Sequence, residues 1–366
     1  RHTRPGLSTS IHDRARLYII LAYQHGDSSL PINNQPTPHL TQLRALILVS
    51  LYTNFLSDLA ISVPGPMAPI VVVTPSHLVN PAATSSQLET SSSQLDGVPR
   101  DVEDAVRYHT ASLIQAAGIL LRLPQDIIAA AIVTLQRFWV GPDGGSVLEH
   151  DAQDTAAAAL YLAAKPSGHT VHPRQLLTAF TYLHSVYPDF RSAADGTLDP
   201  QWQLPEGQYE VARDRLYEIE AQILRVLGFQ THVALPYSLC INYLQTLDVF
   251  QHDRPTGSRL ARRAFKHLNG ALLSPQLLYL THQPPSLATA AIYLAARELD
   301  VKLPEGEWWE VFDVDREELG FLVVALQSLE GFVREDRREW GRRKVPLTAE
   351  GLRSELERRR MLEEGL

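Results

Sequence analysis

The sequence predicts an all-α protein made of two tandem five-helix bundles. From Pro99 onward, apolar residues recur three and four apart, which is the spacing of one helix face. Two alanine-rich segments are apolar on every side, as expected of helices enclosed by other helices. Residues 158–165 match 290–297 at a constant offset of 132 residues, far beyond solenoid periods of roughly 20–50, so a duplicated domain is favoured. The expected parts are an N-terminal extension over 1–98, a first bundle over 99–230, a second over 231–334 and a charged tail over 335–366.

Proline, glycine and polar loops divide the first bundle into five helices. Carboxylates in the first turn after Pro99 favour a helix start there. Pro124 ends that helix and opens the next, and Gly228 is placed as a C-terminal cap of the fifth. After the first, the expected helices cover 125–140, 151–165, 173–187 and 206–227.

The second bundle is expected to repeat this helix order. A break at Ser274-Pro275 leaves open whether its second segment is one helix or two. The expected segments cover 235–250, 258–280, 287–299, 305–312 and 315–333.

The N-terminal region shows no lasting helical pattern. Residues 1–66 are rich in proline, histidine and serine, and Met67, the first methionine, is hypothesised to be the native start. The apolar stretch 43–63 contains Arg44 and Asp58, so it is a poor membrane span, and no secretory signal is evident. Residues 84–93 lack an apolar face and are expected to form a flexible arm.

Composition limits the possible functions. A formal net charge of −8 weighs against a whole-protein nucleic-acid binder. The single cysteine, Cys240, excludes an intramolecular disulfide and a multi-cysteine zinc site, and a reducing compartment fits best. In the tail, residues 342–344 and 358–360 are basic triplets. One interpretation is that the tail is a solvated helix or a disordered end, and the other is that the triplets are a nuclear-import signal.

No catalytic constellation is found in the sequence, and no cofactor is expected. Glycine-rich phosphate loops, nucleophile elbows and zinc-protease motifs are missing. His169 and His172 could face one metal, but turn and cap roles are favoured because no carboxylate or cysteine lies at ligand spacing. Cys240 is interpreted as a buried small hydrophobe. Trp308 and Trp309 are interpreted as core residues rather than a ligand platform.

Several segments resemble the cyclin family, and the cyclin L group in particular. The run LIQAAGILLRLPQ at 113–125 is similar to the first cyclin-box helix, and VTLQRF at 133–138 to the second. YLAAK at 161–165 and YEIEAQILRVLGF at 217–229 resemble the third and fifth helices, and ATAAIYLAAR at 288–297 resembles the matching helix of the second repeat. The resemblance therefore implies two tandem cyclin folds in a non-catalytic regulatory subunit.

By this resemblance, Lys165 and Glu220 would meet at the edge of the first bundle. They would bind there the backbone near the αC helix of a cyclin-dependent serine/threonine kinase. Docking would swing αC inward, so that the kinase forms the Lys–Glu pair that holds ATP phosphates. The implied setting is nuclear, in RNA polymerase II transcription or pre-mRNA splicing, with no direct nucleic-acid or membrane partner. The residues alone also allow that Lys165 caps its helix and that Glu220 pairs with arginines such as Arg213.

The sequence departs from the family at two places. Pro166-Ser167-Gly168 follows the lysine where cyclins carry a hydrophobic residue and then glutamates, and no Arg/Ser-repeat tail is present. Two rival interpretations remain. One is a general transcription factor B-like protein, which would need a cysteine-rich zinc ribbon and a basic face. The other is a helical scaffold that controls no kinase.

Overall fold

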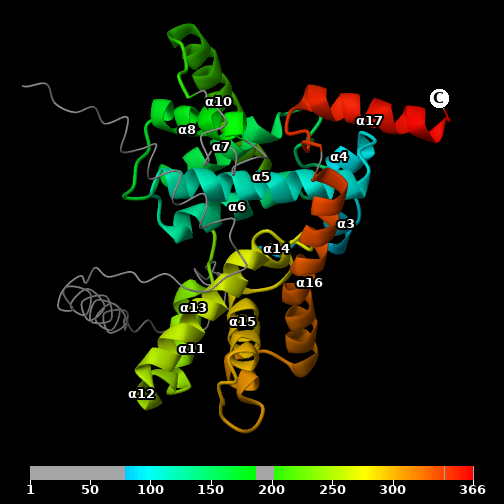
Figure 1. Cartoon of the computed structure of the whole chain (residues 1–366). Helices are drawn as coiled ribbons and strands as arrows, with labels where there is room; N and C mark the ends of the chain where they lie inside the picture. The colour runs from blue at the N-terminus through cyan, green and yellow to red at the C-terminus, as the bar shows by residue number, and fades with distance from the viewer. Residues whose placement is uncertain (1–78, 187–201, 342, 366) are drawn as a thin grey trace, which may run out of the picture. The chain divides into compact units, whose positions relative to one another are not determined.

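The computed structural model describes residues 79–186, 202–341 and 343–365, and across these ranges it contains helices and no strand (Figure 1). The prediction of an all-α fold is confirmed. The predicted features of 1–66 lie outside the described residues. The helices are α3 Ser85–Glu89, α4 Ser92–Leu95, α5 Arg100–Leu120, α6 Gln125–Trp139, α7 Ala152–Ala164, α8 Pro173–Val186, α10 Glu206–Val226, α11 Tyr237–Thr246, α12 Val249–His252, α13 Arg254–Ala271, α14 Leu278–Thr281, α15 Pro284–Glu298, the 3₁₀ helix η1 Trp308–Phe312, α16 Arg316–Trp340 and α17 Ala349–Glu363.

The first bundle is assembled around α7. This helix packs against α5, α6, α8 and α10, and Ala156, Ala158 and Ala159 have no exposed surface. Alanine allows the neighbouring helices to approach closely, because its side chain ends at the β carbon. The predicted central helix is therefore confirmed, and its neighbours surround it on several sides (Figure 1).

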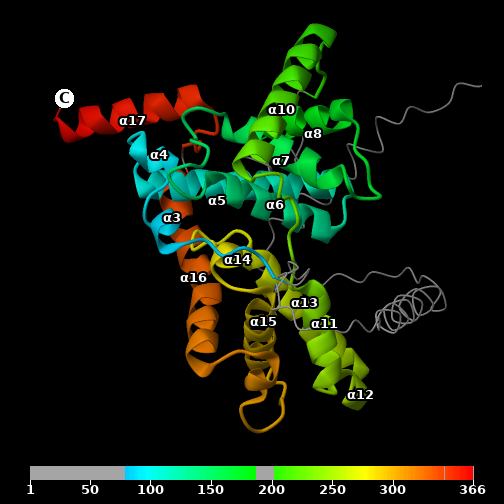
Figure 2. The same cartoon turned by 180° about the vertical axis from the view of Figure 1, so that it is seen from behind.

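The second bundle is assembled in the same way around α15, which packs against α11, α13, α14, α16 and η1. Both views show α15 between α13 and α16 (Figures 1 and 2). Its first residue, Pro284, follows the first residue of α7, Ala152, by the same 132 residues as the matching alanine-rich segments. The two central helices thus agree in start and burial, while the boundaries of the four parts remain a prediction.

Several elements of the second bundle differ from the sequence-based ranges. The segment expected at 235–250 is two helices, because Asp248 at φ 56° turns the backbone out of the helix between α11 and α12. Helix α13 starts at Arg254, four residues early, with Pro255 in its first turn. The break at Ser274-Pro275 separates α13 from the short α14, and α16 extends beyond 333 to Trp340.

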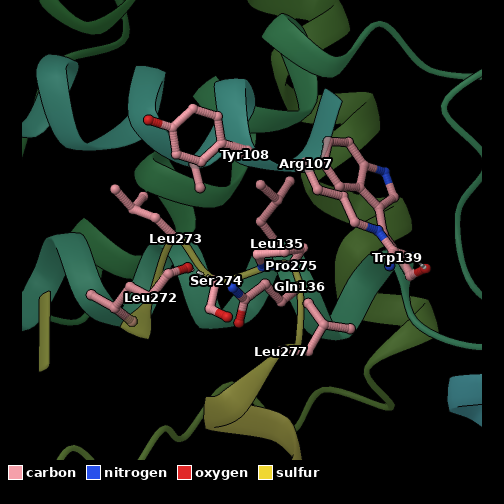
Figure 3. A pocket seen from close by; sticks show the side chains of 11 residues that line it. Arg107, Tyr108, Leu135, Gln136, Trp139, Leu272, Leu273, Ser274, Pro275 and Leu277 are labelled. Atoms are coloured by element: carbon pink, nitrogen blue, oxygen red, sulfur yellow. Dashed lines mark hydrogen bonds between the residues drawn. The ribbon is translucent and has the colours of Figure 1, made fainter. Parts of the chain in front are cut away.

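The two bundles meet where α6 faces the segment before α14. The Gln136 amide donates to the Leu272 carbonyl at 2.7 Å across this junction (Figure 3). Beside it lies a cavity of about 10 Å³, which has room for about one water molecule and not for an organic ligand. The junction is therefore a packing contact rather than a binding pocket.

The segment expected to be a flexible arm differs from that expectation, because it is helical in α3 and α4 and the second of these helices is packed. Its polar side chains make buried hydrogen bonds in place of an apolar face. Ser91 donates to Glu103 at 2.7 Å and Gln94 donates to the same carboxylate at 2.9 Å. Arg107 completes the network with an ion pair to Glu103 at 2.8 Å. Glu103 is fully buried, so these three partners together compensate its lost hydration.

Asn80 joins the N-terminal segment to the second bundle. Its side-chain amide exchanges two hydrogen bonds with the backbone of Ala234, at 2.7 and 2.8 Å. The amide of Gln283 exchanges two more with the Asn80 backbone, both at 3.0 Å. Since α4 bonds to the first bundle, the segment from 79 to 98 binds both bundles, and we call it the N-terminal strap.

The charged tail is packed as well. Val345, Leu347 and Leu352 are buried, and Arg359 pairs with Asp101 of α5 at 2.6 Å. The helical alternative for the tail therefore holds, but α17 is only partly solvated. Within the described ranges no helix combines the length and hydropathy that a membrane span requires.

Candidate functional site

The structure brings Lys165 and Glu220 together. The Lys165 ammonium donates to both carboxylate oxygens of Glu220, at 2.6 and 2.8 Å. Lys165 is the C-cap of α7 and Glu220 lies on α10, so the pair joins the third and fifth helices of the first bundle. The sequence-based expectation that these two side chains meet is confirmed, whereas their role in binding a kinase stays a prediction.

Local sequence places each member of the pair. Ser167 ends α7 just after Lys165 by donating its hydroxyl to the Ala164 carbonyl at 2.7 Å. A cation at this end is favoured by the partial negative charge of the helix C-terminus. On α10, Leu216, Ile219 and Ile223 form the buried stripe, and Glu220 lies at its edge.

The two side chains differ in exposure. The Glu220 side chain is 8% exposed, whereas that of Lys165 is 46% exposed. A nearly buried carboxylate needs hydrogen-bonding compensation, and Lys165 supplies it. The outer side of the ammonium remains open to solvent, so it can donate to an acceptor on another protein.

Two tyrosines enclose the ammonium. Lys165 Nζ lies 4.6 Å from the ring centroid of Tyr161 and 5.9 Å from that of Tyr217, within cation–π range. Burial, reinforced by neighbouring Tyr217, raises the pKa of Tyr161 to about 12, so its hydroxyl stays protonated. The pair is thereby held in one geometry before any partner arrives.

The alternative role of Glu220 is not observed. Arg213 instead contacts its neighbour Asp214, at 3.0 Å. The alternative role of Lys165 does hold, because it occupies the end of α7. A role in docking is compatible with this position, since the helix end involves the backbone of Lys165 and docking would involve its side chain.

The other singled-out residues have structural positions. Cys240 is buried in α11, and burial raises the pKa of its thiol to about 12, so it is not a ready nucleophile. Trp308 is buried beside half-buried Trp309, in agreement with core packing. His169 is exposed in the loop after α7 and His172 precedes α8. Among the described residues, no group of three His, Cys, Asp or Glu side chains could hold a metal ion.

Sequence analysis missed Tyr161 and Tyr217. A usable signal was present, because Tyr161 precedes Lys165 by four residues and Tyr217 precedes Glu220 by three, and such neighbours share a helix face. The contact between the two tyrosines, at 6.1 Å between ring centroids, depends on how α7 and α10 pack. Only the structure could supply it.

Fold and site together define a protein of two alanine-centred helical bundles with an exposed, preorganised ion pair at the edge of the first. Among solved structures, the yeast RNA Pol II CTD kinase CTDK-1 complex contains a chain that matches with a TM-score of 0.54 at 15% identity, covering 77% of this chain and 84% of that one. That likeness shows the fold.

Sequence similarity points to the same group of proteins as the resemblance. Mouse cyclin-L2 is 29% identical, and the match covers 77% of this chain and 49% of the mouse protein. Chicken cyclin-L1 is 28% identical, and the match covers 82% of this chain and 52% of the chicken protein. No family model matches the chain. The chain is similar to cyclins L1 and L2. It spans about half the length of the curated relatives it matches.

Proposed function

We propose that this chain is a non-catalytic regulatory subunit that binds and activates a cyclin-dependent serine/threonine kinase. The observation that supports this most directly is the half-exposed Lys165, fixed by buried Glu220 at the edge of the first bundle. Since the cyclin would supply no reacting group, it acts by stabilising the active conformation of its partner. Its effect is limited by its difference in affinity for the two kinase conformations.

The proposed setting is nuclear RNA polymerase II transcription, with or without pre-mRNA splicing. The similarity to cyclins L1 and L2 supports this setting, and so does the fold shared with a chain of a complex described as an RNA Pol II CTD kinase. Pro166, Ser167 and Gly168 replace acidic residues that cyclins usually carry here, so we propose that Lys165 and its tyrosines provide most of the contact at this edge.

The test is kinase activation by a variant that lacks the pair. The chain is used to capture a kinase from native extract, and phosphorylation of an RNA polymerase II tail peptide is measured with and without added chain. Lys165→Ala with Glu220→Ala is expected to abolish activation while leaving the helix content unchanged. The variant removes the charged donor that would face the kinase, and the loss of such a contact costs about 2–5 kcal/mol of binding.

The same two helices offer a matched control. Arg215 of α10 contacts Asp154 of α7 at 3.0 Å, at the other end of their contact. Asp154→Ala with Arg215→Ala removes one cation and one anion from the same helix pair and is expected to preserve activation. Wild-type activation by the Lys165/Glu220 variant would reject the docking site. Failure of the wild-type chain to capture any kinase would favour the scaffold interpretation instead.

A further inference from the structure

The second bundle carries a concentrated basic surface on α13. This helix has five Lys and Arg residues and no Asp or Glu in its 18 residues, whereas the whole chain has 33 basic and 41 acidic residues. Leu260, Ala264 and Leu268 have no exposed surface and face the bundle. The basic residues therefore gather on the opposite, solvent-facing side.

Arg254 is the first residue of α13, and the other four basic residues, together with His267, fall into two groups. Arg263 and His267 both contact Glu298 of α15, which holds them against their own bundle. Arg259, Arg262 and Lys266 are exposed, and within the described ranges no carboxylate lies within ion-pair distance of them. We call these three residues the α13 basic row.

The three charges of the row repel one another. Like charges three and four residues apart destabilise a helix, and here Arg262 follows Arg259 by three residues and precedes Lys266 by four. Neutral polar residues at these exposed positions would not repel one another. A bound anion would remove this repulsion.

We propose that the α13 basic row docks a phosphorylated serine or threonine segment of a substrate protein. A phosphate group carries close to two negative charges at neutral pH and forms short, charge-assisted hydrogen bonds with guanidinium groups. Seven residues of helix extend about 10 Å, and an extended peptide covers that length in about three residues. The row thus fits a segment with a phosphate and a second acidic group about three residues apart.

A nucleic acid fits the surface less well. Duplex DNA carries a negative charge about every 1.7 Å and gains affinity from many simultaneous contacts. Three cations on one helix of a chain with net charge −8 offer few such contacts and repel the rest of a long polyanion. The short row therefore selects a short, densely charged ligand.

This inference extends the proposed function, because multisite phosphorylation of a kinase substrate would create the ligand. Substrate already phosphorylated once would return to the second bundle while the first bundle holds the kinase. The two proposals are tested separately. Binding at the α13 basic row is assayed on the chain alone, and docking at Lys165 is assayed as kinase activation on an unphosphorylated peptide.

The assay is fluorescence anisotropy of a labelled 12-residue serine peptide carrying two phosphates three residues apart, with the unphosphorylated peptide in parallel. The chain is expected to bind the phosphorylated form at least about tenfold more tightly, with affinity falling as salt rises. Arg262→Glu with Lys266→Glu is expected to lose at least about tenfold in affinity.

The control is Lys302→Glu with Arg316→Glu, which changes net charge equally at two exposed positions of the same bundle. Its affinity for the phosphorylated peptide is expected to lie within about threefold of the wild-type affinity, because only the net charge has changed. If charge reversal disturbs folding, the neutral variant Arg262→Gln with Lys266→Gln is tested in its place. Its melting temperature is measured to show that it is folded. The proposal would be overturned if both charge-reversed variants lost affinity for the phosphorylated peptide equally. It would also be overturned if the chain bound the unphosphorylated peptide equally well, or a 20-nucleotide RNA more tightly.

Discussion

Lys165 and Arg297 occupy matching positions in the two bundles, yet their surroundings differ. Each lies four residues after a tyrosine on the central helix, and Arg297 approaches Tyr293 at 6.0 Å as Lys165 approaches Tyr161 at 4.6 Å. Lys165 has the buried partner Glu220, whereas within the described ranges no carboxylate pairs with Arg297. The next residue, Glu298, turns instead toward α13. The central helix is thus common to the two bundles, whereas the ion pair at its end is found only in the first of them among the described residues.

The largest expected difference between the two positions concerns kinase binding. Lys165→Ala is expected to weaken binding by about 2–5 kcal/mol, because it removes the charged donor that would face the kinase and leaves the Glu220 carboxylate unpaired in the interface. Arg297→Ala is expected to change the affinity by less than about 0.5 kcal/mol, as for surface substitutions in general. Titration of captured kinase with each variant measures both values, and similar losses would contradict a docking edge confined to the first bundle.

The second prediction addresses what the bundles share. Ala159 and Ala291 are fully buried at matching positions of α7 and α15. Changing either to leucine should destabilise the protein by about 1–3 kcal/mol, because added methyl groups overpack a closely packed contact. Thermal unfolding of the two single variants should show losses of similar size. A loss at only one position would break the equivalence of the central helices.

The third prediction concerns α5, the first helix of the first bundle. Burial raises the pKa of Asp104 from 3.8 to about 6, partly offset by Arg107 and Arg100. Because the folded state holds this proton more tightly than the unfolded state, the stabilisation is complete below pH 3.8 and is lost as pH rises through about 6. At neutral pH, Asp104→Asn should raise the free energy of unfolding by about 1–2 kcal/mol. This is less than the full pKa shift would give, because the Asp104 side chain is 21% exposed and solvent screens the effect.

Denaturant unfolding of both forms at pH 4 and pH 7 measures this effect. The variant should gain more at pH 7 than at pH 4. An equal gain at both pH values would show that the carboxyl titrates alike in the folded and unfolded states.

The smallest effect is expected at α11, the first helix of the second bundle. Because the Cys240 thiol is buried and its pKa is raised to about 12, alkylation by iodoacetamide at pH 8 should be undetectable in the folded chain and complete in denaturant. Mass spectrometry of the alkylated peptide measures the extent. Rapid labelling without denaturant would show that α11 opens readily.

Much of the first bundle could be predicted because its signals are local. Alanine-rich composition indicates an enclosed helix, and Pro124 marks a helix boundary, whatever the rest of the chain does. The meeting of Lys165 with Glu220 came from a family resemblance, since 55 residues separate them. Nothing local in the sequence specifies such a contact.

The N-terminal strap shows why the rest could not be predicted. Composition around Ser91 favours disorder, but burial of Glu103 depends on partners from another segment. Asn80 bonds to residues 154 and 203 positions away, and amide-to-backbone bonds at such distances leave no periodic trace. For the same reason the buried side chains around α17 were interpreted only as part of a charged tail.

The strap also has a practical consequence for anyone trimming this protein for crystallisation. A fragment cut at the boundaries of the two bundles, 99–334, would keep every central helix yet discard Ser91, Asn80 and all of α17. It would leave the Glu103 carboxylate without two of its three donors and would bare the apolar surface that Leu352 covers. Cloning limits at 79 and 363 should therefore yield soluble material where the shorter piece precipitates.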